Sequence, residues 1–566
     1  MAKNIETIQL YTTDGEKLIG GEIKNTWDIY PRPQLKRDSF FSLNGKWEIE
    51  TDKGKEDILV PFPPESVLSG VGRIIDENPK YTYKKSFTLP DGFVKDRVIL
   101  HFGAVDQVCE IKLNGKLVGA HIGGYDAFSF DITDALEAEN TLEVYVEDNL
   151  DSHILPYGKQ KNNRGGMWYT PVSGIWQTVW VESVPKKYIS ALDIKVTLDT
   201  ATITFEGISD GKVTVKTENG EICADVIDSV ATIKIENPKN WTPEDPYLYN
   251  FIAESGSDKI ESYFALRTLE VKTVDGISRM CLNGKPYFFH AMLDQGYFPD
   301  GIFTPATPEC YEGDVLFAKA HGFNTLRKHI KVEPECFYYY CDKHGIIVFQ
   351  DMVNNGHYSF MRDTVLPTFG MKNFPDKKLH KDERSRKAFR DGMKATVNQL
   401  KNHPSICLWT VFNEGWGQFD AENMYFEMKA LDSSRFIDTA SGWFKAKNTD
   451  IESEHIYFKP VKLKKNEKPI FISEFGGYTY KENGHVFNEQ KTYGYGKFAD
   501  RAEFEDAFVK LYEEQIVPYI GMGLCATVYT QISDVEDETN GLISYDRKFS
   551  KVSQERMCQL AKKLKI

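Results

Sequence analysis

Apolar residues alternate with polar ones in short runs over the first half of the chain. Between about Asp38 and Ser183 these runs are separated by Gly, Asn and Asp, and a helical period is nearly absent. The Asn114-Gly115 pair between two apolar runs is a typical hairpin turn. This pattern predicts an all-β sandwich or jelly roll. A second β stretch, from about Lys187 to Thr268, has the length of an immunoglobulin-like sandwich.

The pattern changes after about Leu269, where buried strand-like runs alternate with segments of helical period or polar loops. The strand-like runs are residues 286–293, 323–330, 346–352, 406–414, 435–441, 451–458, 469–475 and 525–532. The helical segments include residues 308–322, 334–345, 386–403, 421–434 and 501–521. Such alternation favours one (β/α)8 TIM barrel. A doubly wound open sheet would also alternate, but the sequence contains neither a GxGxxG nor a Walker motif.

Composition and charge argue against several partners and locations. Lys and Arg number 69 against 83 Asp and Glu, a formal net charge of −14. Nucleic acid and anionic membranes require clustered positive charge instead. The first residues lack an apolar signal region, no run approaches a transmembrane length, and the nine cysteines are scattered. We therefore expect a cytoplasmic protein with reduced thiols and no nucleic-acid or membrane partner.

Two predicted barrel strands end in a glutamate that follows buried apolar residues. Glu414 comes at the end of the fourth strand, after Asn413, and Glu474 comes at the end of the seventh. In a (β/α)8 barrel, chemistry is located at the C-terminal ends of the strands. A buried carboxylate is costly unless it is paired or used. Two facing carboxylates are the pair that glycoside hydrolysis needs, one as acid and the other as nucleophile or base.

Several further motifs carry a resemblance to glycoside hydrolase family 2, which includes β-galactosidases, β-glucuronidases and β-mannosidases. These motifs are Leu43-Asn44-Gly45-Lys46-Trp47, Pro61-Phe62 with Glu65-Ser66, Ser173-Gly174-Ile175-Trp176, residues 241–249 and Leu266-Arg267-Thr268. The resemblance covers nearly the whole chain. It implies a jelly-roll sugar-binding-like domain with an N-terminal extension over residues 1–184. An immunoglobulin-like sandwich over 185–268 and a catalytic barrel over 269–566 would follow.

The resemblance also implies a role for each matching residue. Glu414 matches the general acid/base and Glu474 the nucleophile, while Asn413 would hydrogen-bond the sugar 2-hydroxyl. Tyr457 would orient Glu474, and Arg327 would keep that carboxylate ionised, since a nearby cation lowers a carboxylate pKa. The implied reaction is a retaining double displacement with the carboxyl groups about 5–5.5 Å apart. No redox cofactor or nucleotide is required.

The loop after the eighth strand departs from the pattern of the glucuronidases in this family. Those enzymes carry Asn-x-Lys before a Gly, and the Lys binds the sugar carboxylate. Here residues 535–541 contain no Lys, and with Asp534 the region holds four carboxylates. Negative charge would repel a uronic acid, so the sequence favours a neutral sugar. The alternative is that a cation after the third strand reaches inward, from Arg362, Lys372 or Lys377.

A second departure concerns metal binding. Metal-dependent galactosidases of the family bind Mg²⁺ through Glu-x-His after the third strand, and this sequence has Asn355-Gly356-His357. The glutamate, a hard oxygen ligand, is therefore lost. This matters because Mg²⁺ is usually held by carboxylates and water. We expect no required metal at the active site.

The sugar contacts are predicted from positions near the barrel mouth. His290 and Asp294 lie at the first strand, where they would meet hydroxyl groups. The family's Arg-x-x-His is one residue shorter here, so His329 is either a sugar contact just past the strand end or a buried structural histidine. Tyr529 ends the last strand, and Trp168 lies in an N-terminal-domain loop that reaches the mouth in relatives.

These features favour an exo-acting β-galactosidase that acts on an oligosaccharide or glycoconjugate. Within the family, the alternatives are a β-glucuronidase or β-galacturonidase, or an α-L-arabinopyranosidase. A non-catalytic carbohydrate-binding protein is the alternative of a different class, and the presence of both glutamates argues against it. An endo-acting barrel glycosidase is a further alternative, which the N-terminal domain disfavours by analogy. A homo-oligomer is expected, because two β domains on a barrel leave large surfaces.

Overall fold

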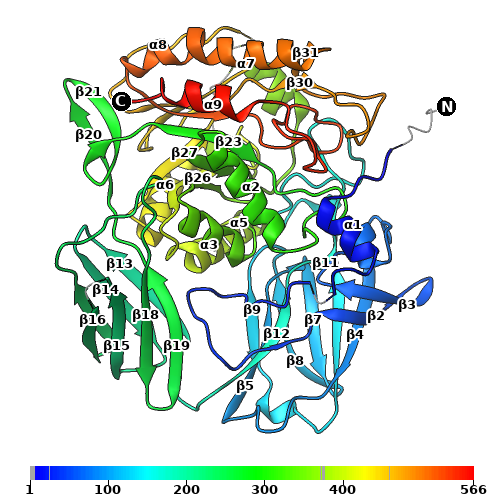
Figure 1. The fold of residues 1–566 in the computed structure, drawn as a ribbon. Coiled ribbons are helices and arrows are strands. Elements are labelled where there is room, and N and C mark those ends of the chain that lie inside the picture. Colours follow the sequence, from blue (N-terminus) through cyan, green and yellow to red (C-terminus); the bar gives the residue numbers. More distant parts are fainter. Residues whose placement is uncertain (1–6, 25, 219, 370, 372–375, 458) are drawn as a thin grey trace.

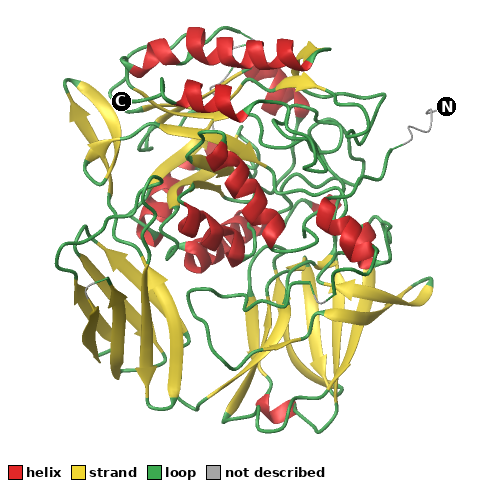
Figure 2. Ribbon diagram, viewed as in Figure 1, coloured by secondary structure: helices red, strands yellow, loops and turns green. Residues whose placement is uncertain are grey.

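The computed structural model describes residues 7–24, 26–218, 220–369, 371, 376–457 and 459–566. Two β domains lie side by side below a larger domain of helices packed around a sheet (Figures 1 and 2). This arrangement confirms the predicted fold class of jelly roll, immunoglobulin-like sandwich and (β/α)8 barrel. No helix of the described residues is long and apolar enough to cross a bilayer.

The N-terminal domain is an antiparallel β-sandwich. One sheet has the order β3-β2-β4-β10-β7-β8, and the facing sheet has the order β1-β12-β5-β9. Side chains alternate along its strands, so Leu142, Val144 and Val146 of β10 enter the core between the sheets. The elements are α1 (Thr13–Ile19), β1 (Phe41–Ser42), β2 (Gly45–Thr51), β3 (Gly54–Val60), η1 (Val67–Ser69), β4 (Lys80–Phe87), β5 (Arg97–Phe102), β6 (Val105–Asp106), β7 (Val108–Leu113), β8 (Lys116–Ile122), β9 (Phe128–Asp131), η2 (Thr133–Ala135), β10 (Asn140–Glu147), η3 (Leu150–Ser152), β11 (Gly174–Ile175) and β12 (Val179–Val184).

The middle domain is formed by antiparallel strands in the order β13-β14-β17-β16-β15-β18-β19. Its core contains Val213 and Val215 of β15 together with Phe251 of β18, which face inward at alternate positions. The strands are β13 (Ala191–Val196), β14 (Thr200–Glu206), β15 (Asp210–Thr217), β16 (Gly220–Ile227), β17 (Val230–Lys234), β18 (Tyr249–Ser255) and β19 (Asp258–Phe264). A small sheet of β20 (Leu269–Val274), β21 (Ile277–Leu282) and β22 (Lys285–Pro286) leads into the barrel.

In the described part of the chain, eight parallel strands form the barrel sheet in the order β27-β26-β25-β24-β23-β32-β29-β28. The strands are β23 (Phe289–Asp294), β24 (Thr325–Lys328), β25 (Ile347–Asp351), β26 (Ile406–Asn413), β27 (Phe436–Ser441), β28 (Glu452–Ile456), β29 (Ile470–Phe475) and β32 (Leu524–Tyr529). The helices are α2 (Glu309–Ala320), α3 (Glu335–His344), α4 (Leu366–Thr368), α5 (Glu383–Leu400), α6 (Ala421–Leu431), α7 (Arg501–Gln515), α8 (Val517–Ile520) and α9 (Gln554–Ala561), with short turns η4 (Met361–Val365) and η5 (Asp376–Lys378). A small pair, β30 (Tyr478–Tyr480) and β31 (Tyr495–Phe498), follows β29.

Alternation along the barrel strands decides which side chains enter the barrel interior. On β23, Phe289 packs inside the barrel, where its ring lies 5.4 Å from that of Phe349 on β25. His290, the next residue, stacks instead on Phe323, 4.0 Å away in the layer outside the barrel. A strand therefore sends every second side chain toward the helices, and a shift of one residue moves a side chain from one face to the other.

The N-terminal segment, which precedes the sandwich, contacts the barrel through hydrogen bonds. The backbone N–H and the hydroxyl of Thr12 both donate to the Asp300 carboxylate at 2.7 Å, and the Trp27 indole N–H donates to the Pro305 carbonyl at 2.9 Å.

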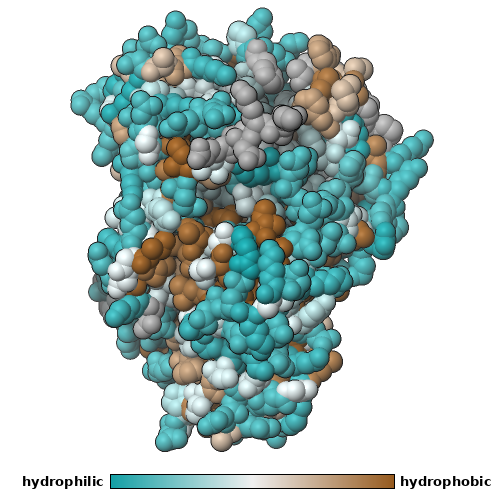
Figure 3. All heavy atoms as spheres, turned by 90° about the vertical axis from the view of Figure 1, so that its right-hand side faces the viewer, coloured by the Kyte–Doolittle hydropathy of each residue, from teal (hydrophilic) through white to brown (hydrophobic). Residues whose placement is uncertain are grey.

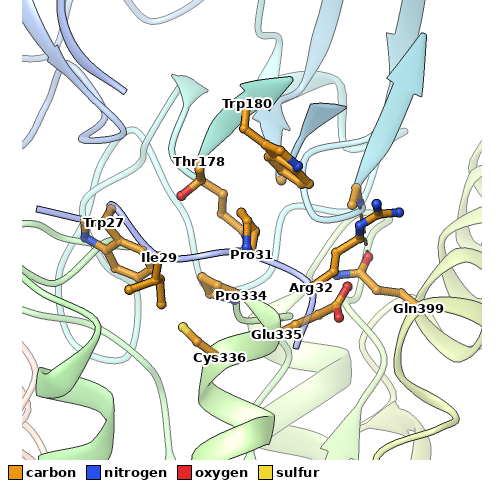
Figure 4. Close-up of a pocket in the computed structure, with 13 residues that line it drawn as sticks. Trp27, Ile29, Pro31, Arg32, Thr178, Trp180, Pro334, Glu335, Cys336 and Gln399 are labelled. Carbon is orange, nitrogen blue, oxygen red and sulfur yellow. Dashed lines mark hydrogen bonds between the residues drawn. The ribbon is translucent and has the colours of Figure 1, made fainter. Parts of the chain in front are cut away.

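A cavity of about 30 Å³ remains where this segment meets β12 and α3 (Figure 4), and it is too small for a sugar. The face seen in Figure 3 is mainly hydrophilic, with hydrophobic side chains gathered in separate groups.

We predict that Trp27→Ala weakens the contact between the N-terminal segment and the barrel. The indole is buried and meets Tyr311 edge-on at 6.1 Å, so its loss should lower the free energy of unfolding by about 3–5 kcal/mol. Chemical denaturation followed by tryptophan fluorescence and circular dichroism measures this change. Ile19→Ala on α1 is the control, since Ile19 is 55% exposed and should change stability by less than about 0.5 kcal/mol. Equal effects of both variants would contradict the assignment.

Candidate active site

Glu414 and Glu474 lie together at the C-terminal end of the barrel. Glu414 directly follows β26 and adopts a left-handed backbone (φ 51°), and Glu474 lies within β29. The register of β29 shifts against both neighbouring strands between Ile472 and Phe475, and such bulges re-aim side chains. One oxygen of each carboxylate lies within 4.8 Å of the other and of a His455 ring nitrogen. The two carboxyl groups are therefore close enough to act on one bound group.

The Glu474 carboxylate is held by a cation and a tyrosine. The Arg327 guanidinium donates to its Oε1 at 3.1 Å, and the Tyr457 hydroxyl donates to its Oε2 at 2.5 Å. Burial raises the pKa of Glu474, whereas His455, Arg327 and the Tyr457 hydrogen bond counteract that rise. Since the ionised form receives these interactions directly, Glu474 is the better-stabilised anion of the two.

Among the described residues, no Lys or Arg is in contact with the Glu414 carboxyl. Burial raises its pKa to about 7, and the more distant charges of Lys159 and Arg327 only partly oppose this rise. His455 Nδ1 lies 2.8 Å from Glu414 Oε1 and forms a hydrogen bond with it. Burial lowers the pKa of His455 to about 4, so this ring is neutral near pH 7. The two carboxyl groups therefore lie in unlike environments, Glu474 in contact with a guanidinium and Glu414 in contact with a neutral imidazole.

His455 was not among the sequence-predicted site residues. It lies two residues before Tyr457, and alternation along β28 places positions i and i+2 on one face, which is the signal that would have found it. Asn413 was predicted, and it lies at the same end of the barrel. Arg327 donates to its Oδ1 at 2.8 Å, and among the described residues its Nδ2 has no hydrogen-bond partner.

His329 and Trp168 also lie at the barrel mouth. His329 follows the last residue of β24, its Nδ1 forms a hydrogen bond with Gln295 at 2.8 Å, and its Nε2 lies 3.6 Å from Glu474 Oε1. Trp168 comes from the N-terminal domain and stacks on Trp416 with ring centroids 5.4 Å apart. The two predicted residues thus reach the site from different domains.

The structure corrects three predicted sugar contacts, His290, Asp294 and Tyr529. His290 and Asp294 face the helices: His290 Nδ1 hydrogen-bonds the Gly322 carbonyl at 3.1 Å, and Asp294 accepts from Lys328 at 2.6 Å. Tyr529 packs on Phe508 of α7, and its hydroxyl accepts from the Tyr478 N–H at 3.2 Å. In each case the strand phase turns the side chain away from the mouth. The next residue after Tyr529, Thr530, reaches the site, with its hydroxyl 2.9 Å from that of Tyr457.

Two cations partly neutralise the acidic loop after β32. Lys551 donates to Asp534 at 2.6 Å, and Arg164 lies 3.2 Å from Glu536 and 3.6 Å from Asp537. Only Glu538 lacks a cation within 4.0 Å among the described residues, and its partner is the Gln531 amide, which donates at 2.9 Å. The predicted repulsion of a uronic acid by this loop is therefore much weaker than the sequence suggests.

The cations expected after the third strand are engaged elsewhere or lie outside the described residues. Arg362 pairs with Asp363 at 2.5 Å, and Lys377 is exposed and lies 3.6 Å from Asp420. Lys372 lies outside the described residues. The Asn355 amide donates to the carbonyls of Ile154 and Ser385.

A cavity of about 320 Å³ opens beside His455 and Tyr457. Trp443, Pro367 and Leu463 provide apolar walls, and Lys459 and Lys462 lie on its lining as well. The cavity is connected to the carboxyl pair through His455 and Tyr457, since His455 contacts Glu414 and Tyr457 contacts Glu474.

Curated relatives match the chain at low identity. A β-galactosidase of Thermoanaerobacter pseudethanolicus is 26% identical over 441 residues, which are 70% of this chain and 54% of that protein. A putative β-glucuronidase of Formosa agariphila is 26% identical over 435 residues, 70% of this chain and 49% of that protein. The chain thus spans about half the length of the curated relatives it matches.

Solved structures match over almost the whole chain. A β-D-glucuronidase of Dictyoglomus thermophilum has a TM-score of 0.72 at 19% identity, covering 94% of this chain and 98% of that one. A family 2 β-galacturonidase of Eisenbergiella tayi bound to galacturonate has a TM-score of 0.66 at 19% identity, covering 94% and 99%. At such identities the likeness concerns the fold alone.

Three domain models of one family match in the order in which the domains occur. The galactose-binding domain-like model of glycosyl hydrolase family 2 matches residues 72–171, the family 2 model matches 182–267, and the family 2 TIM barrel model matches 278–556. Together they cover most of the chain and all three of its domains. On this basis, the chain belongs to glycoside hydrolase family 2.

Proposed function

We propose that the protein is a retaining exo-glycosidase that removes one terminal β-linked sugar. The observation that carries this proposal is the close pair of buried carboxyl groups in unlike environments. Glu474 contacts a guanidinium and a tyrosine hydroxyl, and Glu414 is a buried acid whose pKa is raised to about 7. The double displacement needs a nucleophile and a proton donor that lie close together.

In the first step, Glu474 attacks the anomeric carbon while Glu414 gives its proton to the departing oxygen. This yields a covalent glycosyl-enzyme and the free alcohol. In the second step, Glu414 takes a proton from water, the water oxygen attacks the same carbon, and the Glu474 ester bond breaks. Two inversions give net retention. The free Nδ2 of Asn413 is suited to the sugar 2-hydroxyl, and the cavity beside Tyr457 is suited to the leaving group.

The N-terminal domain supports action at a chain end. Trp168 stacks on Trp416, and the Tyr157 hydroxyl donates to the Gly356 carbonyl, so a loop of the sandwich covers one side of the mouth. For the sugar itself, the lack of a Lys in the loop after β32 favours a β-galactoside. The neutralisation of that loop by Arg164 and Lys551 favours a uronide as the second candidate.

We predict opposite stereochemical outcomes when azide replaces the two carboxylates. Glu414→Ala and Glu474→Ala should each reduce turnover of an activated aryl glycoside, by about 10³-fold or more for Glu474. Azide should rescue Glu414→Ala as a glycosyl azide of retained configuration, and Glu474→Ala as one of inverted configuration, both assigned by NMR. Glu427→Ala on α6 is the control with unchanged activity. Exchanged configurations would exchange the two roles.

The pH profile should show a basic limb that belongs to Glu414. This group acts as an acid only when protonated, so kcat/KM should fall as the pH rises through about 7, the value to which burial raises its pKa. An unactivated alkyl glycoside is the appropriate substrate, because its leaving group needs the proton. In Glu414→Gln the basic limb should disappear together with most of the activity. A limb that persists unchanged in this variant would assign it to another group.

Activity should not depend on a divalent metal, since Asn355 stands where metal-dependent galactosidases offer a carboxylate. The measurement is hydrolysis of 4-nitrophenyl β-glycosides before and after dialysis against EDTA. We expect equal rates. A loss that added Mg²⁺ restores would show that other ligands at the mouth replace the missing glutamate.

A further inference from the structure

Lys159 enters the barrel mouth from the N-terminal domain. It lies in the segment between β10 and β11, where the Tyr169 N–H donates to its carbonyl at 3.0 Å. The preceding Gly158 has φ 65°, and a Cβ there would lie 2.9 Å from the Ile330 carbonyl just past β24. This glycine lets the loop approach the barrel strands closely. The backbone therefore fixes Lys159 over the site rather than in solvent.

The side chain of Lys159 is mostly buried and packs against aromatic rings. The residue is 6% exposed, and its Nζ lies 5.4 Å from the centroid of Trp416 and 5.5 Å from that of Tyr169. Trp416 also stacks on Trp168, the aromatic residue from the same loop. Such rings exclude water and leave the charge in a medium where ionic contacts are strong.

Other buried cations at this end of the barrel have a carboxylate partner in contact. Arg327 contacts Asp351 and Glu474, Lys328 contacts Asp294 and Glu333, Lys331 contacts Glu333, and Lys551 contacts Asp534. Lys159 differs from them: among the described residues, no carboxylate oxygen lies within 4.0 Å of its Nζ, and it forms no hydrogen bond through that group. An ammonium in such a position, with no carboxylate in contact, is available to an anionic group of a ligand.

The charge of Lys159 acts between the acid and the loop after β32. Burial raises the pKa of both Glu414 and Glu538, and Lys159 is the leading opposing influence on each. The ammonium is therefore close to the place where the substrate must lie, yet it forms no ion pair with either carboxyl group.

We propose that Lys159 binds a carboxylate of the glycoside substrate and so makes the enzyme selective for acidic glycosides. This inference rests on the proposed glycosidase function and specifies its substrate class. The carboxylate is that of a terminal uronic acid or one carried by the leaving group. In either case the cation comes from the sandwich domain, since residues 535–541 of the barrel contain none and Lys551 is paired with Asp534.

The test compares wild type, Lys159→Met and Lys161→Met on substrate pairs that differ in one group. Two pairs are 4-nitrophenyl β-galacturonide with the β-galactoside, and 4-nitrophenyl β-glucuronide with the β-glucoside. Within each pair the only difference is the group on C5, which is a carboxylate in the uronide and a hydroxymethyl in the neutral glycoside. A third pair carries a neutral sugar with a 4-nitrophenyl or a 3-carboxy-4-nitrophenyl leaving group. Lys161 is the matched control. It lies two residues after Lys159 in the sequence, its side chain is exposed, and its Nζ lies over the Trp168 ring.

We expect Lys159→Met to lower kcat/KM about 100-fold on the carboxylate-bearing member of a pair and less than about threefold on its neutral partner. Loss confined to the uronides assigns the sugar carboxylate, and loss confined to the acidic aryl group assigns the leaving group. Lys161→Met should leave both unchanged. Equal changes on all substrates, with the basic limb of the pH profile moved upward, would show that Lys159 acts only through Glu414 and would overturn the proposal. An unchanged Lys159→Met would overturn it as well.

Calorimetric binding of galacturonic and glucuronic acid, beside galactose and glucose, separates this inference from the glycosidase proposal. Uronic acids that bind wild type at least tenfold tighter than the neutral sugars, with that preference lost in Lys159→Met, sustain the role of Lys159 even if no glycoside is hydrolysed. If the uronic acids bind in this way but no glycoside is hydrolysed, the proposed glycosidase function is refuted while the role of Lys159 stands. Hydrolysis of neutral glycosides alone, with no acid preference in either assay, keeps the glycosidase and refutes the role of Lys159. No binding and no hydrolysis would refute both.

Discussion

The fully buried guanidinium of Arg327 is the interaction on which the geometry of the active site depends. It donates to Asp351 on β25, to Asn413 on β26 and to both the carbonyl of Ser473 and the carboxylate of Glu474 on β29. These groups come from strands that are not all neighbours in the barrel sheet. One planar donor set thus fixes the relative positions of several strand ends. Arg suits this task because its donors are rigidly arranged and stay charged.

This arrangement also explains how two glutamates in one small space take different charges. Like charges at such a separation cannot both be ionised without a compensating cation. Arg327 contacts one of the pair directly, so it favours the ionised form of Glu474, whereas the contact of Glu414 is a neutral histidine. The unequal division follows from which carboxylate the guanidinium reaches. A site with the cation placed between the two would not separate an acid from a nucleophile in this way.

The sequence predicts the barrel and the centre of its site well, because both depend on local patterns. Buried runs, helical segments and a glutamate at a strand end are visible without tertiary information, and Glu414 and Glu474 lie together in the structure. Arg327 and Tyr457, which the resemblance to family 2 indicated, both contact Glu474. The phase of a buried strand is not visible in this way. In β23 and β32 both faces are buried, so the apolar pattern does not tell inside from outside, and His290 and Tyr529 were assigned to the wrong face.

Of the contributions from the N-terminal domain, the resemblance to relatives indicated Trp168, but the ion pairs between domains depend on how surfaces meet and were not predicted. The acidic loop after β32 seemed to exclude an anionic sugar because its carboxylates were counted without their partners. Arg164, from the sandwich domain, and Lys551, from the barrel, partly neutralise that loop. The same sandwich loop that supplies Arg164 also supplies Lys159.

Charge at the mouth is therefore set jointly by two domains. The barrel supplies one of these cations, Lys551, and the neighbouring domain supplies Arg164. Residues 159 and 164 are five positions apart on one loop, so two of the positive charges near the mouth come from a single segment. Because that segment belongs to the sandwich, the charge at the mouth depends on the packing between the first and last domains as well as on the barrel.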